Sequence, residues 1–215
     1  MLRRPTYTLL LLFFAVSAFA AGKNDYDALL AGLKKGDRNI DFSALRIAYT
    51  RTPSYKPYDE PMEVIKPMLD AMRAKDYAKA IQYADTLLKA NYVDIGVHRV
   101  LRNAYTHLNN KEKADFHKFV FDGLIKSIQD SGDGLSAKTA YKVINVAEEY
   151  DLLGFLGFKM ENQRLVNEGG HFFDRMEVKN IKTGQNAVLY FNVDLPYNWM
   201  VNQTKASTPP AKASK

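Results

Sequence analysis

The sequence predicts an α+β fold, with antiparallel helical hairpins followed by a small antiparallel β-sheet. Apolar residues recur at helical spacing between residues 24 and 130. Short runs rich in β-branched and aromatic residues replace this pattern between residues 138 and 200. Ser131–Gly134 separates the two patterns and carries two glycines, which are typical of a turn. We therefore predict a single α+β domain over residues 21–203.

Two short helices are predicted at the start of this domain. One spans Asp25–Lys35 and ends at Gly36, and Asp41 is a suitable N-cap for the other. The second helix is followed by Thr52–Tyr58, whose two prolines disfavour a helix and favour an extended segment. We expect the tyrosines of this segment to lie across the domain surface.

An arginine and three tyrosines in and around the extended segment are candidate binding residues. They are Arg46, Tyr49, Tyr55 and Tyr58. Aromatic side chains beside an arginine can form a recognition surface for a peptide or a glycan. They can equally hold an extended segment against helices, and the prolines favour this second interpretation because they order the segment for packing.

Four longer amphipathic helices are predicted next. Their ranges are Glu63–Arg73, Asp76–Ala90, Asp94–Leu108 and Lys111–Gln129. Residues 75–80 align with residues 109–114 at a spacing of 34, which places Ala80 and Ala114 at matching positions. A small alanine suits the close crossing of two helices. The pattern resembles a degenerate tetratricopeptide repeat without its usual tryptophan, glycine and closing proline; a generic helical bundle is the alternative.

The C-terminal third of the chain carries the predicted sheet. Tyr141–Ala147 is short and β-branched, Glu148–Gly157 has a helical pattern, and Phe158–Val166 is ambiguous between helix and strand. Two further strands, at Phe172–Lys179 and Ala187–Leu195, flank a hairpin loop with a glycine. The antiparallel sheet is therefore expected to be built around this hairpin.

The two ends of the chain predict export and disorder. Arg3 and Arg4 precede the apolar run Leu9–Val16, and small residues follow up to Ala20, which is the pattern of a signal peptide. A membrane anchor is the alternative, but the whole apolar stretch Leu9–Ala21 has 13 residues, fewer than the roughly 20 that a spanning helix needs. We expect cleavage near Ala20, a periplasmic or secreted protein, and no membrane span after cleavage. Thr204–Lys215 is expected to be a disordered tail.

Composition excludes several classes of function. The chain has no cysteine, which excludes disulfides, thiolate metal sites and cysteine nucleophiles. The formal net charge of +6 comes without a run of lysines and arginines, so no nucleic-acid partner is predicted. Gly132–Ala137 fits a dinucleotide fingerprint, but a helix precedes it and a strand follows it, the reverse of what such a site needs. No cofactor is predicted.

Few residues suggest catalysis or metal binding. The four histidines form no metal-binding pair at helical spacing, and no serine-nucleophile motif is present, so neither a catalytic residue nor a metal ligand is assigned. His171 and Asp174 could form an acid–base pair, although such a histidine more often caps a turn. Glu148, Glu149 and Asp151 form the densest acidic cluster, which at a helix N-terminus ordinarily complements the helix dipole. A cation or substrate site is the alternative for this cluster.

A set of short motifs in a fixed order resembles the DUF4919 family of uncharacterised exported bacterial proteins. The motifs are Asp41-Phe42-x-x-Leu45-Arg46-x-x-Tyr49, Tyr55-x-Pro57-Tyr58, Gly132-Asp133-Gly134, Glu148-Glu149-Tyr150-Asp151-Leu152-Leu153, Gly170-His171-x-x-Asp174 and Leu189-Tyr190-Phe191-Asn192. The resemblance runs from about Ile40 to Trp199. It implies a bacterial, exported, single-domain protein and supplies no activity or catalytic residue.

Two functional hypotheses follow from the sequence. The first is a non-enzymatic protein- or peptide-binding module of the periplasm, for example a partner that neutralises a toxin; Arg46, Tyr49, Tyr55, Tyr58, His171 and Asp174 are its candidate binding residues. Basic positions on the helices, among them Lys79 and Arg99, would favour an acidic partner. The alternative is an envelope hydrolase with a site around His171, Asp174 and Glu148. If these three side chains lie in separate places, the alternative loses its basis.

Overall fold

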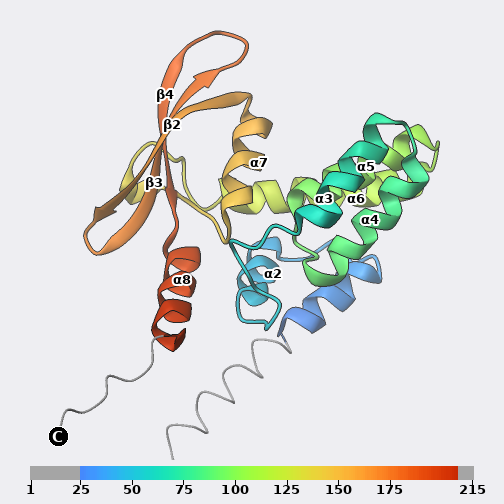
Figure 1. Ribbon diagram of the computed structural model, residues 1–215, viewed down its shortest axis with the longest axis horizontal. Helices are drawn as coiled ribbons and strands as arrows, with labels where there is room; N and C mark the ends of the chain where they lie inside the picture. The colour runs from blue at the N-terminus through green and yellow to red at the C-terminus, as the bar shows by residue number, and fades with distance from the viewer. Residues whose placement is uncertain (1–24, 208–215) are drawn as a thin grey trace, which may run out of the picture.

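The computed structural model describes residues 25–207, and these residues adopt the expected α+β fold with the helices before the sheet (Figure 1). The expected signal peptide lies outside the described residues, as does the end of the expected tail. Residues 25–34 are helical, and α2 (Phe42–Tyr49) follows. The side chain of Asp41 accepts a hydrogen bond from the Ala44 amide, which confirms Asp41 as the N-cap of α2.

Four helices pack against one another in chain order. They are α3 (Met62–Arg73), α4 (Tyr77–Ala90), α5 (Ile95–His107) and α6 (Lys111–Gln129). The geometry at the start of α4 recurs at the start of α6. Lys75 and Asn109 both have a positive φ, and the side chains of Asp76 and Asn110 both cap the helix that follows. The 34-residue spacing in the sequence therefore corresponds to a repeated turn in the structure.

The sheet has the strand order β1-β4-β3-β2. Its strands are β1 (Tyr141–Lys142), β2 (Phe158–Glu168), β3 (His171–Asn180) and β4 (Asn186–Asn192). The ambiguous segment is thus strand β2. The expectation of a purely antiparallel sheet is wrong at one edge, where β1 pairs with β4 in parallel. The reason is that the chain leaves β1 through α7 and re-enters the sheet at its far edge, so β4 returns in the direction of β1.

Helix α7 (Val146–Leu156) lies between the sheet and helices α3–α6 (Figure 1). It ends at Gly157, whose φ of 75° is a left-handed conformation that glycine adopts without strain. Helix α8 (Asp194–Ser207) follows β4 directly. The expectation of disorder from Thr204 onward is wrong for residues 204–207, because they form the last turn of α8. The Thr204 hydroxyl donates to the Met200 carbonyl one turn earlier.

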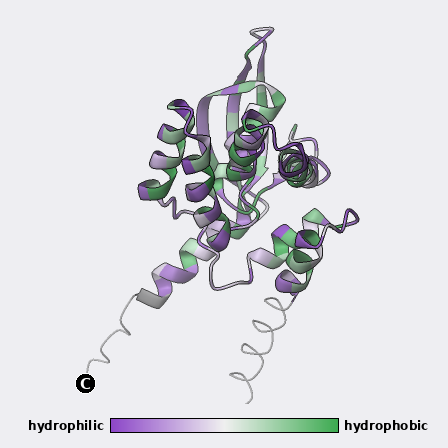
Figure 2. Cartoon of the chain, turned by 90° about the vertical axis from the view of Figure 1, so that its right-hand side faces the viewer, coloured by the Kyte–Doolittle hydropathy of each residue, from purple (hydrophilic) through white to green (hydrophobic). Residues whose placement is uncertain are grey.

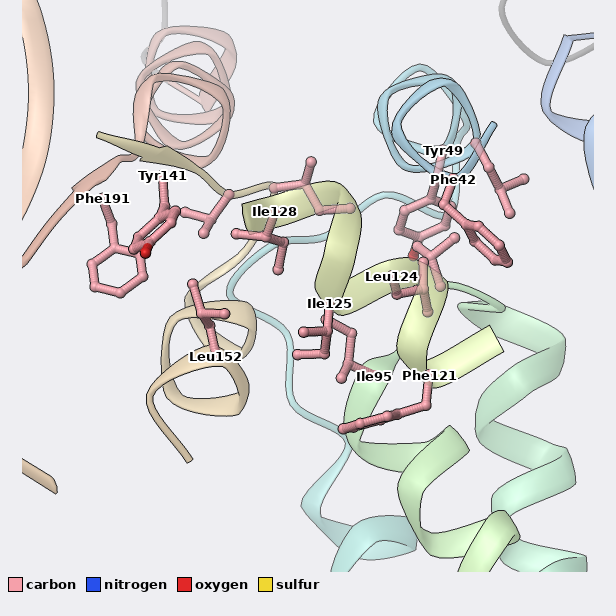
Figure 3. Close-up of a cluster of buried hydrophobic side chains, with 14 of the residues drawn as sticks. Phe42, Tyr49, Ile95, Phe121, Leu124, Ile125, Ile128, Tyr141, Leu152 and Phe191 are labelled. Atoms are coloured by element: carbon pink, nitrogen blue, oxygen red, sulfur yellow. The ribbon is translucent and has the colours of Figure 1, made fainter. Parts of the chain in front are cut away.

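The main hydrophobic core joins the helices to the sheet. Figure 3 shows its side chains converging from α2, α6, α7 and the edge formed by β1 and β4. Phe42, Leu124, Ile128, Leu152 and Phe191 are all buried in it. This core draws on residues from both halves of the chain, so the helices and the sheet share one hydrophobic core.

A second, smaller core lies between helices α3, α4 and α5. Its buried members are Met68, Ala84, Leu87, Leu88, Val97, Val100 and Leu101. Hydrophobic and hydrophilic residues occupy different sides of the helices, as Figure 2 shows. Apolar residues packed against this core, such as Ile65 and Met72, are only partly covered, and Leu69 of α3 is 37% exposed. The α3–α5 side of the molecule therefore leaves apolar surface open to solvent.

Candidate functional site

Arg46 forms a buried ion pair with Glu148 and is the centre of a polar network. It is 2% exposed and donates to both carboxyl oxygens of Glu148, to Ser127 Oγ at 3.1 Å and to the Lys142 carbonyl at 3.0 Å. Glu148 also accepts from the Ile144 amide at 2.9 Å. The network links α2, α6, β1 and α7. Arg46 is therefore an internal anchor, and the structure does not offer it to a partner.

Tyr49 and Tyr55 hold the extended segment against the core. Both side chains are buried, and their rings meet edge to face at 5.8 Å between centroids. The Tyr49 hydroxyl donates to the Ser54 carbonyl at 3.0 Å, and the Tyr55 hydroxyl donates to the Ile144 carbonyl at 2.5 Å. Of the two interpretations drawn from the sequence, this geometry fits packing, because buried rings cannot contact a ligand.

Tyr58 differs from the other two tyrosines because it is 45% exposed. Its ring lies 6.3 Å from the Trp199 ring of α8. Partial burial raises the pKa of Tyr58, and the nearby carboxyl groups of Asp174 and Glu149 raise it further. Tyr58 is therefore the one member of the predicted arginine–tyrosine set that a partner can reach.

His171 and Asp174 do not form the pair that the sequence suggested. They lie three residues apart on β3, so their side chains point to opposite faces of the sheet. His171 instead contacts Asp194, with 2.7 Å between Nδ1 and Oδ2. Asp194 also accepts from the Phe172 amide and the Asn192 side chain, so this cluster fastens the start of α8 to β3.

The three residues of the hydrolase hypothesis are held by different partners. Glu148 pairs with Arg46, His171 with Asp194, and the buried Asp174 accepts from Gln163 Nε2 at 2.8 Å. No hydrogen bond or ion pair joins any two of the three within residues 25–207. The geometry therefore supplies no shared site for general acid–base chemistry by these residues.

Glu149 is a buried ionisable residue whose burial the sequence did not indicate. It is fully buried, and no described group donates a hydrogen bond to either of its carboxyl oxygens. Burial raises the pKa of Glu149 to about 9, and the facing Asp174 carboxyl adds to the shift. The side chain is therefore protonated at neutral pH. The acidic cluster in the sequence signalled this position, but its burial depends on how α7 packs against β3.

His98 and His117 form a second buried pair that the sequence did not indicate. Their Nδ1 atoms lie 2.9 Å apart, and His98 Nε2 lies 2.8 Å from the Tyr92 carbonyl. Burial lowers the pKa of His98 to about 3 and that of His117 to about 4. Both rings are thus neutral at pH 7, and they join α5 to α6. The residues are 19 positions apart and on different helices, so their spacing carries no signal.

Asp151, the third acidic residue of α7, contacts the first residues of α5. Its Oδ1 is 3.3 Å from Arg99 Nη2, and the side chain is 12% exposed. Burial raises the pKa of Asp151 to about 6, because the opposing effect of Arg99 is too small to compensate and Asp94 adds repulsion. Asp94 caps α5 by accepting from the Val97 amide at 2.9 Å, and burial raises its pKa as well.

Asp151 and Asp94 line a cleft of about 330 Å³ between the extended segment, α3, α5 and α7. Five apolar residues of α3 and α5 form what we call its apolar wall: Ile65, Met68, Leu69, Val97 and Val100, of which Leu69 is exposed and Ile65 half-buried. The polar part of the lining carries four acidic residues, Asp59, Glu60, Asp94 and Asp151, with Lys56 and Arg99 as the described basic residues. Apolar side chains with a few fixed polar groups are the usual composition of a binding site.

Of the six candidate binding residues from the sequence, none lines this cleft. The extended segment that carries Tyr55 and Tyr58 nevertheless forms one border of it, through Lys56, Pro57 and residues 59–61. The six candidate residues thus lie outside this cleft, and their role in binding stays a prediction. The acidic cluster on α7 was the more direct signal, since Asp151 faces the cleft.

Comparison with known protein families identifies the family of the chain. A family model described as "Domain of unknown function (DUF4919)" matches residues 20–201, which confirms the resemblance drawn from the motifs. Neither the curated proteins nor the solved structures contain a match to the chain. Over residues 25–207, no helix combines the length and the apolar character that crossing a membrane requires.

Proposed function

We propose that this chain, which belongs to the DUF4919 family, is a non-enzymatic binding module that holds a segment of a partner protein or a peptide. The proposal includes export: the signal-peptide pattern at residues 1–20 supports action in the periplasm or outside the cell. A toxin-neutralising partner is one concrete form of this function.

The cleft between the extended segment, α3, α5 and α7 is the observation that carries the proposal. Its apolar wall includes Leu69, which is 37% exposed, and the neighbouring Met62 is 52% exposed. Burial of such side chains by a partner contributes roughly 25 cal/mol for each Å² of apolar surface. Helices α3 and α5, which supply this wall, pack on the second core, and a wall formed before binding limits the entropic cost.

The proposed partner differs from the acidic one that the basic helix positions suggested, and the partners of three cations support this change. Arg99 is already paired with Asp151, and the guanidinium of Arg102 lies over the Phe121 ring. Lys113 likewise lies over the Tyr105 ring. These three cations are engaged within the protein, while four acidic residues line the cleft.

Site-specific photo-crosslinking in the native host tests the proposal. A benzophenone amino acid at Leu69, on the cleft wall, is expected to give a discrete crosslinked product. The matched control places it at Leu165, an exposed apolar residue of β2 (54% exposed) outside the cleft. Absence of a product at Leu69, or the same products at both positions, would overturn the proposal.

Fractionation tests the export part separately. The mature protein is expected in the periplasmic fraction or the medium, and mass spectrometry is expected to find an N-terminus near Ala21. A cytoplasmic protein that retains Met1 would contradict this part and leave the binding site untouched.

A further inference from the structure

The cleft on the α3–α5 side combines an apolar wall with carboxylates that exceed the local cations. Four acidic and two basic described residues line it, although the full chain carries a net charge of +6. The excess of negative charge is therefore a local property of the cleft. A ligand of opposite charge would gain electrostatic energy there, and charges at the rim of a site mainly set its selectivity.

Two of the carboxylates converge on one point of the wall, at Gly96. A Cβ atom added to Gly96 would lie 3.5 Å from Asp94 Oδ1 and 3.5 Å from Asp151 Oδ2. Gly96 is in the first turn of α5, and its lack of a side chain leaves this point open to the cleft. Asp94 and Asp151 are thus presented together to whatever occupies the cleft.

Their existing partners do not neutralise these acidic groups. Arg99 approaches Asp151 at 3.3 Å, through one contact, and its side chain is 48% exposed. Lys56 serves Asp59 at the rim instead. The side chain of Glu60 lines the cleft and is exposed. The N-terminus of α5 offers backbone amides to Asp94 and Asp151, yet the pKa of each stays raised, chiefly because burial removes water from them.

We propose that the occupant of the cleft is a polypeptide segment that carries a lysine or arginine next to an apolar residue. This inference rests on the proposed binding function. The cationic group meets the carboxylates of Asp151 and Asp94, with Glu60 at the entrance, and the apolar residue packs on Leu69, which is exposed, and Ile65, which is half-buried. Charge-assisted hydrogen bonds of this kind are among the strongest that proteins form, so the cation sets the preference.

Selection from a random heptapeptide library displayed on phage tests the inference. The immobilised full chain is expected to enrich lysine or arginine beside leucine, isoleucine, valine or phenylalanine. The same selection on Gly96→Leu, whose side chain fills the cleft between the two carboxylates, is expected to lose this enrichment. Gly96→Ala is a milder second variant, since its Cβ fits at ordinary contact distance.

Fluorescence anisotropy with one enriched peptide then measures the charge preference. Replacing its basic residue by norleucine is expected to weaken binding roughly tenfold or more at low salt, and added salt should reduce the difference. Asp151→Asn and Glu60→Gln should weaken the binding of the basic peptide and leave the affinity for the norleucine peptide unchanged. Asp122→Asn, in an exposed pair with Lys118 on α6, is the matched control and should change neither affinity.

The outcomes separate this inference from the function on which it rests. Enriched peptides that lack basic residues but still depend on an open Gly96 would overturn the inference and retain the binding module. The inference would also be overturned if the wild type enriched no sequence whose enrichment is lost in the selection on Gly96→Leu. The crosslinking result at Leu69 decides the binding function independently.

Discussion

Glu148 and Glu149 are neighbours on α7, and both are almost completely buried, yet the protein treats them in opposite ways. Glu148 receives hydrogen bonds from Arg46 and from the Ile144 amide. Glu149 receives none from the described residues and faces a second carboxyl, Asp174. The difference teaches that the partner, rather than burial, decides whether a buried acid stabilises a fold.

The geometry of a helix explains how two adjacent residues reach such different surroundings. Successive side chains on a helix point about 100° apart. Glu148 consequently faces α2 and its arginine, while Glu149 faces β3 of the sheet. Asp151 points to a third neighbour, the start of α5. One acidic turn thus meets three elements, and each contact can be tested separately.

Breaking the satisfied side of the comparison should have the largest effect. Arg46→Met leaves Glu148 buried without its cation, and loss of one partner of a buried ion pair costs roughly 3–5 kcal/mol. Urea unfolding at pH 7 measures this as a lower midpoint. Arg73→Met, which removes an exposed pair with Asp70, is the control and should cost less than about 1 kcal/mol. Equal effects of the two variants would show that the Arg46 network is not an anchor.

Neutralising the unsatisfied side should have the opposite sign. Glu149→Gln removes the need to protonate a carboxyl in the folded state. The pKa of Glu149 is about 9 in the fold, against an ordinary value of 4.5. The penalty builds up from pH 4.5 to pH 7 at about 1.4 kcal/mol per pH unit, so the expected gain at pH 7 is about 3 kcal/mol. Glu148→Gln is the matched control and should destabilise. A loss of stability in Glu149→Gln by urea unfolding would contradict the assignment of Glu149.

The pH dependence of stability sharpens the same comparison. A raised carboxyl pKa gives stability that is fully present below pH 4.5 and is lost as pH rises toward 9. His98 and His117 have lowered pKa values, so their contribution is lost only as pH falls below about 6.5. Between pH 7 and 9 the wild type should therefore lose about 2 kcal/mol of unfolding free energy, and Glu149→Gln should lose little. Parallel curves for the two proteins would refute this account.

Removing a single neutral hydrogen bond beside Glu148 should have the smallest effect. Tyr55→Phe keeps the buried ring and deletes the bond to the Ile144 carbonyl, for an expected cost of about 1 kcal/mol. Tyr150→Phe, whose hydroxyl bonds Gln163 at an exposed position, is the control and should cost less than about 0.5 kcal/mol. Thermal unfolding of the three proteins ranks them. A neutral Tyr55→Phe would mean that ring packing alone holds the extended segment.

Local patterns predicted the helices well because their signals are local. The apolar spacing in Tyr77–Ala90 and the cap at Asp41 involve residues only a few positions apart. The same holds for the hairpin of β3 and β4. The predicted pair of His171 and Asp174 was wrong, because alternate side chains of a strand point to opposite faces. His171 contacts Asp194 instead, since the first residue of α8 returns beside β3.

The sequence by itself determined the α+β class, the position of the four long helices before the sheet and the family to which the chain belongs. Only the tertiary structure decided which acidic residue of α7 is paired, which is left protonated in the interior, and which lines a cleft. The reason is that the sequence shows an acidic residue but not the surroundings into which its side chain points. Its energy depends on the water removed from it and on the charge placed opposite it.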